Sequence, residues 1–173
     1  MKSIKMYLPA ILFFMALLGN VQTAWTQTRQ EKKAAKALEI KNLIDSQAYV
    51  FYAESVTPMS GRNRHLTSDY TVDITKEKVV SDLPYFGRAY SAPIGSSEGG
   101  IKFTSTNFEY AIKDRKKGGW NITIKPKDVQ EVQSFNLSVF DNGSATLQVG
   151  STNRQSISFS GEIRQRKNNS TAK

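Results

Sequence analysis

The stretch "NFEYAIKDRKKGGWNITIK", Asn107 to Lys125, decides the fold class of this chain. Apolar residues alternate with polar ones on both sides of a lysine-glycine turn: Phe108, Tyr110 and Ile112 come before it, and Trp120, Ile122 and Ile124 after it. Side chains that alternate in this way point to opposite faces of a β-strand. Two such segments joined by a glycine-containing turn predict an antiparallel β-hairpin.

A second hairpin is predicted directly downstream, around the turn residues "DNG". Asn142 and Gly143 are the residue types that accept the positive φ of a tight hairpin turn. The alternating apolar residues are Phe135, Leu137 and Val139 before the turn, then Ala145, Leu147 and Val149, with Ile157, Phe159 and Ile163 forming a return strand.

The same two-residue period occurs upstream, over residues 47–55, 68–74, 79–83 and 101–104. The sequence therefore predicts an all-β, mainly antiparallel domain over residues 47–163, with eight or nine strands in a meander. A barrel and a sandwich both satisfy this pattern.

Residues 29–44, "RQEKKAAKALEIKNLI", are rich in strong helix formers. Ala34, Leu38 and residues 40–43 recur at steps of three and four, which predicts one amphipathic helix within residues 27–46. We expect its apolar face to pack on the β domain. The alternative is that the helix docks on a partner or a membrane surface.

The first residues have the layout of a secretory signal peptide. Lys2 and Lys5 precede an apolar run over residues 6–18, followed by small and polar residues. The run is shorter than the roughly 20 residues of a spanning helix. We expect residues 1–26 to be removed, with cleavage between Ala24 and Thr26, and the protein to be periplasmic or extracellular without a transmembrane span in the mature chain.

The formal net charge of +9 does not indicate a nucleic-acid groove. The positive excess lies at the two chain ends, including a polar basic tail over residues 164–173, whereas residues 45–160 are nearly neutral. A domain that follows a phosphate backbone is expected to carry a basic patch interleaved with aromatics. We therefore expect no nucleic-acid partner.

Few residues could support catalysis. The chain has no cysteine and one histidine, His65, and it lacks a GxSxG nucleophile motif. Asp69 and Asp73 share one face of a predicted strand, and exposed acids that alternate with apolar residues are expected on a half-buried strand. We expect no enzyme activity, no cofactor and no metal; the less favoured alternative is a hydrolase that depends on His65 or Asp73.

The candidate site is the loop over residues 83–100, "LPYFGRAYSAPIGSSEGG". Tyr85, Phe86 and Tyr90 surround Arg88, and aromatics with arginine are typical of interface hot spots and stacking platforms. Two interpretations stay open. The loop binds a ligand or partner, or its rings close one end of the sheet while Arg88 binds carbonyls or an acid.

The segment "VVSDLPYFGRAYSAPIGSSEGGIKF", with "GRNRHL" before it and "NGSATLQVGSTNRQSISFSG" after it, resembles the family known as domain of unknown function 4251. The resemblance covers about Tyr49 to Ile163 and implies an exported protein similar to those of Bacteroidota. It supplies no activity, substrate or catalytic residue.

The predicted function is an exported, non-enzymatic binding or interaction module. Its ligand or partner, a component of the envelope or the exterior, is unknown. The alternative is a structural cell-envelope protein that docks through its N-terminal helix.

Overall fold

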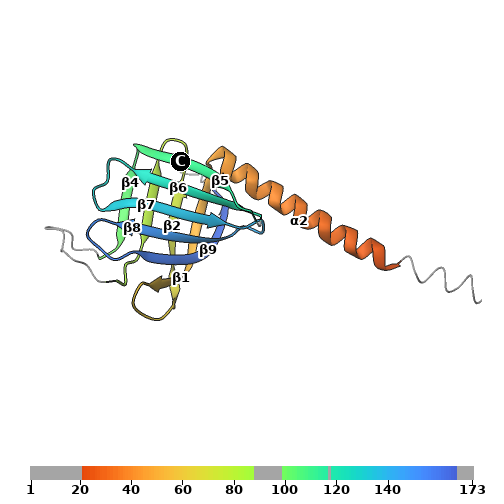
Figure 1. The fold of residues 1–173 in the computed structure, drawn as a ribbon, viewed down its shortest axis with the longest axis horizontal. Coiled ribbons are helices and arrows are strands. Elements are labelled where there is room, and N and C mark those ends of the chain that lie inside the picture. The colour runs from red at the N-terminus through yellow and green to blue at the C-terminus, as the bar shows by residue number, and fades with distance from the viewer. Residues whose placement is uncertain (1–20, 88–98, 117, 167–173) are drawn as a thin grey trace, which may run out of the picture. The chain divides into compact units, whose positions relative to one another are not determined.

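The computed structural model describes residues 21–87, 99–116 and 118–166, with side chains from Thr28 onward. This part of the chain forms one helix followed by nine strands (Figure 1). They are α2 (Val21–Ser46), β1 (Tyr49–Pro58), β2 (Arg64–Ile74), β3 (Val79–Leu83), β4 (Ile101–Ser105), β5 (Phe108–Asp114), β6 (Trp120–Pro126), β7 (Val132–Val139), β8 (Ser144–Ser151) and β9 (Ile157–Gln165). The predicted all-β, antiparallel class is confirmed, and the sheet curls into a nearly closed barrel.

The strand order explains why the barrel is not fully closed. Sheet neighbours run β4-β3-β2-β1-β9-β8-β7-β6-β5, and every described pair is antiparallel, including β1 with β9. Strand directions alternate around such a ring, so an odd number of strands cannot pair antiparallel throughout. The break lies between β4 and β5, which follow each other in the chain without pairing in the described sheet.

Asp128 stabilises the turn between β4 and β5. Its carboxylate accepts hydrogen bonds from the Ser105 hydroxyl and from the backbone N–H groups of Thr106 and Asn107, the latter two at 2.8 and 3.1 Å. The Ser105 bond, followed by the backbone bonds, lowers the pKa of Asp128 to about 2. The chain can therefore turn from one half of the barrel to the other without pairing these two strands.

Closure between β1 and β9 requires a glycine. The register shifts between Ala53 and Ser55, a bulge that brings the backbone of Tyr52 close to Gly161. A Cβ on Gly161 would lie 1.8 Å from the Tyr52 carbonyl oxygen, far inside contact distance.

The barrel interior is one apolar cluster built from the inward positions of the predicted alternation. In β8, for example, Ala145, Leu147 and Val149 are buried and their neighbours are more exposed. The rings of Phe103 and Phe135 meet inside, with centroids 5.5 Å apart. Burying a side chain of this size contributes roughly 1.5–3 kcal/mol, so the interior supplies much of the driving force for folding.

The chain divides after Lys36 into two compact units, and this boundary falls within α2. In the first unit, residues 28–36 are all exposed. In the second, Ile40 and Ile44 are fully buried in the barrel cluster, and Ile40 lies against Gly143, whose φ of 90° makes the predicted tight turn.

The predicted apolar face of the helix was partly wrong. Leu38 was expected on the buried face, yet it is 59% exposed. At 3.6 residues per turn, Ile40 and Ile44 share a face, whereas Leu38 lies on nearly the opposite side from Ile40. Within the described residues, no helix combines the length and the apolarity that crossing a membrane requires.

Candidate functional site

The two ends of the barrel are closed differently. At the helix end, Ile40 and Ile44 meet the β7–β8 turn. The opposite end is here called the distal end. β3 ends and β4 begins there, and the β6–β7 and β8–β9 connections lie at the same end (Figure 1). The distal end contains the described part of the predicted loop.

A buried arginine dominates the distal end. Arg154, in the β8–β9 connection, is only 8% exposed. Its Nη1 donates a hydrogen bond to the Gly100 carbonyl at 3.1 Å, and its Nη2 lies 3.7 Å from Oε2 of Glu131. A buried charge is tolerated only when it is paired and hydrogen-bonded. Arg154 thus ties the entry of β4 to the β6–β7 and β8–β9 connections.

Tyr85 provides the third contact of this arginine. The Arg154 guanidinium carbon lies 5.1 Å from the Tyr85 ring centroid, within cation–π range. The half-buried ring packs on the barrel core, and its hydroxyl donates to the Gln155 carbonyl at 3.1 Å. Gly87 lies beside this hydroxyl, and a Cβ there would come within 2.4 Å of it.

A small hollow lies beside these groups, with room for about one water molecule. Its lining combines apolar and polar side chains, namely Tyr85, Ile101, Glu131, Val132, Val149, Ser151, Arg154, Gln155 and Ile157. The side-chain oxygen Oε1 of Gln155 is buried and has no hydrogen-bond partner within the described residues. Buried acceptors are normally satisfied, so this oxygen is suited to receive a donor that is not among the described residues.

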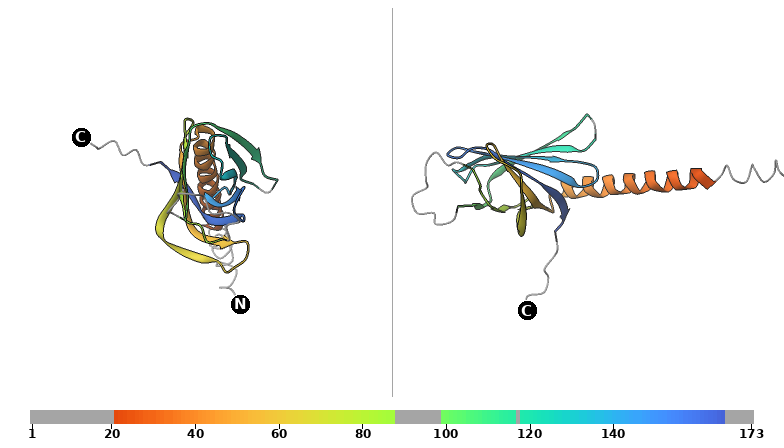
Figure 2. Two further views of the ribbon diagram at one scale, coloured as in Figure 1. Left: turned by 90° about the vertical axis from the view of Figure 1, so that its left-hand side faces the viewer. Right: turned by 90° about the horizontal axis from the view of Figure 1, so that it is seen from below.

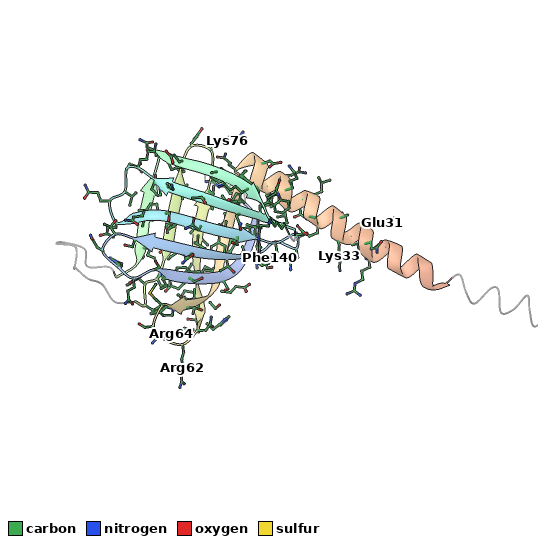
Figure 3. All side chains as sticks on the ribbon, in the orientation of Figure 1. Glu31, Lys33, Arg62, Arg64, Lys76 and Phe140 are labelled. Carbon is green, nitrogen blue, oxygen red and sulfur yellow. The ribbon has the colours of Figure 1, made fainter. Side chains whose placement is uncertain are left out.

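Phe86 contacts a different arginine from the one that Tyr85 contacts. Its ring is 41% exposed, and the guanidinium carbon of Arg64 lies 5.3 Å from its centroid. Arg64 begins β2 and is itself exposed (Figure 3). The structure therefore separates two consecutive residues of the predicted site: Tyr85 joins the core and the hollow, and Phe86 lies on the surface.

The other two predicted site residues, Arg88 and Tyr90, lie outside the described residues. Three further residues of this end, Arg154, Glu131 and Gln155, were not predicted from the sequence. Each lies in a short polar connection that resembles any surface turn, and only the strand pairing brings them to Tyr85. The one local signal was an arginine within the polar turn "STNRQ".

The acidic and histidine candidates are far apart on β2. His65 is exposed and lies opposite Ser55 in the strand register, whereas Asp73 lies opposite Val50 and pairs with Arg166 at 3.3 Å. At about 3.3 Å per residue, His65 and Asp73 are roughly 26 Å apart along the strand. By the same measure Asp69 and Asp73 are separated by roughly 13 Å, more than the separation of about 6.5–9.5 Å in inverting glycosidases.

No group of three or more metal-ligating His, Cys, Asp or Glu residues occurs within the described ranges.

The sequence matches a known protein family over most of its length. The sequence profile of the family described as "Domain of unknown function (DUF4251)" matches residues 31–163. The chain belongs to this family. The match begins inside α2 and ends inside β9, so the family region includes the buried Ile40 and Ile44, strands β1 to β8 and most of β9. The resemblance found from sequence motifs is confirmed.

A solved structure shares the fold. A crystal structure of a DUF4251 family protein from Bacteroides eggerthii DSM 20697 superposes with a TM-score of 0.60. It is 18% identical and covers 77% of this chain and 91% of that chain. Among curated proteins, none matches the chain. The comparisons therefore establish family and fold.

Proposed function

We propose that this DUF4251 protein is an exported, non-enzymatic binding module whose distal end takes a hydroxyl group of a saccharide. The observation that supports this best is that the buried Arg154 and Gln155, whose side-chain Oε1 has no partner within the described residues, both line the hollow. An amide and a cation that line the same small hollow suit a ligand group that both donates and accepts hydrogen bonds.

The hollow limits what can enter. Room for about one water molecule admits one small polar group and excludes a whole ring. A hydroxyl matches this volume, donates to Gln155 and accepts from arginine. The remaining part of a sugar would lie over the rim, where Glu131 is 41% exposed at its side chain and the Tyr85 ring supplies an aromatic surface.

The test is a substitution that separates binding from stability. Gln155→Leu removes the unpartnered acceptor, so the free energy of unfolding should stay the same or rise. Binding of a panel of soluble oligosaccharides, measured by isothermal titration calorimetry, should weaken at least about tenfold for any sugar that binds the wild type, the loss of about one hydrogen bond. Gln148→Leu, on an exposed position of β8, is the matched control and should bind normally.

Two outcomes would contradict the proposal. One is the absence of binding to every sugar of the panel. The other is wild-type affinity in Gln155→Leu, which would place the binding site elsewhere. Export is a part of the proposal that is tested separately: N-terminal sequencing of the secreted protein should show cleavage between Ala24 and Thr26.

A second candidate function is docking through the helix. It is favoured by the exposure of all side chains over residues 28–36, a segment with four basic residues and one acidic residue. Deletion of residues 27–36 should abolish association with the envelope while the barrel stays folded. A longer deletion, to Leu43, would remove Ile40 from the core and confuse the two effects.

A further inference from the structure

β5 is an edge strand of the described sheet. It pairs with β6 and ends the strand order, so no described strand pairs with its other edge. Its residues 111–114 are exposed on both faces, including Ile112 at 38%. The β5–β6 hairpin stands away from the other strands toward its tip (Figure 2). An exposed strand edge is a template for another strand.

The backbone bonds show which residues offer this edge. The Asn107 carbonyl accepts from Lys127 N–H at 2.8 Å, and Arg115 N–H donates to the Gly119 carbonyl at 3.0 Å. In an antiparallel ladder these groups alternate, so residues 107, 109, 111, 113 and 115 direct their N–H and C=O groups to β6. Phe108, Tyr110, Ile112 and Asp114 therefore direct theirs outward.

The sequence of β5 is complementary to itself. A two-fold axis at Ala111 would place Tyr110 opposite Ile112 of a second copy, and these are two of the residues with outward backbone groups. The same register would place Glu109 opposite Lys113 of the second copy in the closer, non-hydrogen-bonded pairs. We infer that β5 is the interface of a symmetric dimer in which the two sheets join edge to edge.

The other free edge lacks these features. β4 has five residues against seven in β5, and pairing it with itself about Phe103 would place Lys102 opposite Thr104. Lys102 already lies 3.5 Å from Asp82. On β5, Lys113 has no ion pair within the described residues, and Glu109 contacts Lys127 at 2.7 Å on the β6 side. The charge pattern therefore favours β5 over β4 as the dimer interface, with the β5 strand of a second copy as its partner.

Charge exchange tests the register. Analytical ultracentrifugation of the wild type should show a concentration-dependent dimer. Glu109→Lys and Lys113→Glu should each weaken it at least about tenfold, because both symmetric pairs become like-charge pairs. An equimolar mixture of the two variants should recover the dimer, since every Lys then faces a Glu. Arg62→Glu makes the same charge change as Lys113→Glu in the β1–β2 turn, far from β5, and should not affect the dimer (Figure 3).

Cross-linking gives an independent measurement. Because the chain has no cysteine, Ala111→Cys introduces a single thiol at the axis, at a Cα separation that a disulfide can bridge. Mild oxidation should give a covalent dimer, and Lys113→Cys, two residues from the axis, should not. A wild type that stays monomeric at all concentrations, or a dimer that neither charge variant weakens, would overturn the proposal.

Discussion

The two ends of the barrel are closed by side chains of different chemistry. At the helix end, Ile40 and Ile44 close the interior with apolar side chains, and the Tyr49 and Tyr110 hydroxyls lie 3.1 Å apart beside them. At the distal end, a buried guanidinium joins a carbonyl, a carboxylate and an aromatic ring. An apolar closure gains free energy from burial alone, whereas a polar closure gains it only while every partner is in place.

This difference also bears on function. Near the helix end, Asp73 Oδ1 on β2, opposite Val50, is buried and has no partner within the described residues, and the same holds for Gln155 Oε1 at the distal end. The difference is that Gln155 lines the distal hollow, together with Arg154, and Asp73 does not. An unsatisfied buried group costs stability, and such costs are often found at binding sites. The contrast is why we assign the ligand to the distal end.

The largest effect should come from the helix end. Ile44→Ala removes a fully buried side chain and should lower the free energy of unfolding by about 3 kcal/mol, because a cavity forms where the neighbours cannot collapse. Leu38→Ala, at a position 59% exposed, should change it by less than about 0.5 kcal/mol. Urea denaturation measures both. Equal losses would mean that the helix packs through a different face.

The next effect should come from Arg154. Arg154→Met keeps much of the side-chain volume but leaves the Gly100 carbonyl without its donor, so we expect a loss of about 2 kcal/mol in the same denaturation experiment. Arg154→Lys should recover less than half of it, since one ammonium group cannot reproduce the geometry of the guanidinium. A fully stable Arg154→Met variant would show that this end is closed by apolar contacts too.

The contrast also shows how far the sequence could predict the structure. The strands were predictable because burial repeats every second residue along each one, as in β8, and this periodicity is local. Position 38 was mispredicted because the helix has apolar residues on more than one side, and only the barrel decides which side is buried. Arg154 could not be predicted, because its partners Gly100 and Glu131 are distant in sequence and come together only through strand pairing.

A smaller effect, with a pH signature, is expected at the helix end. Burial raises the pKa of Tyr110 to about 12 and raises that of Tyr49 well above its usual range. The unfolded chain releases these protons near pH 10 and the folded chain retains them, so stability should be fully present below pH 10 and fall as the pH rises toward 12.

Tyr110→Phe tests this directly. The buried Tyr49 hydroxyl loses the partner that Tyr110 provides, so we expect a loss of about 1.5 kcal/mol at pH 8. The decline of stability between pH 10 and 12 should become shallower, because one group with a raised pKa is absent. Denaturation series at several pH values measure the slope, and an unchanged slope would mean that Tyr110 retains no extra proton affinity in the fold.

The smallest effect separates the two neighbouring aromatics of the loop. Tyr85→Phe keeps the ring against Arg154 and removes only the hydroxyl that donates to the Gln155 carbonyl, so it should cost about 1 kcal/mol. Phe86→Leu, on the exposed ring beside Arg64, should cost about 0.5 kcal/mol or less. If Phe86→Leu lowers the free energy of unfolding more than Tyr85→Phe does, the surface residue contributes more to stability than the Tyr85 hydroxyl. The hydrogen bond of Tyr85 would then not be what joins the loop to the polar closure.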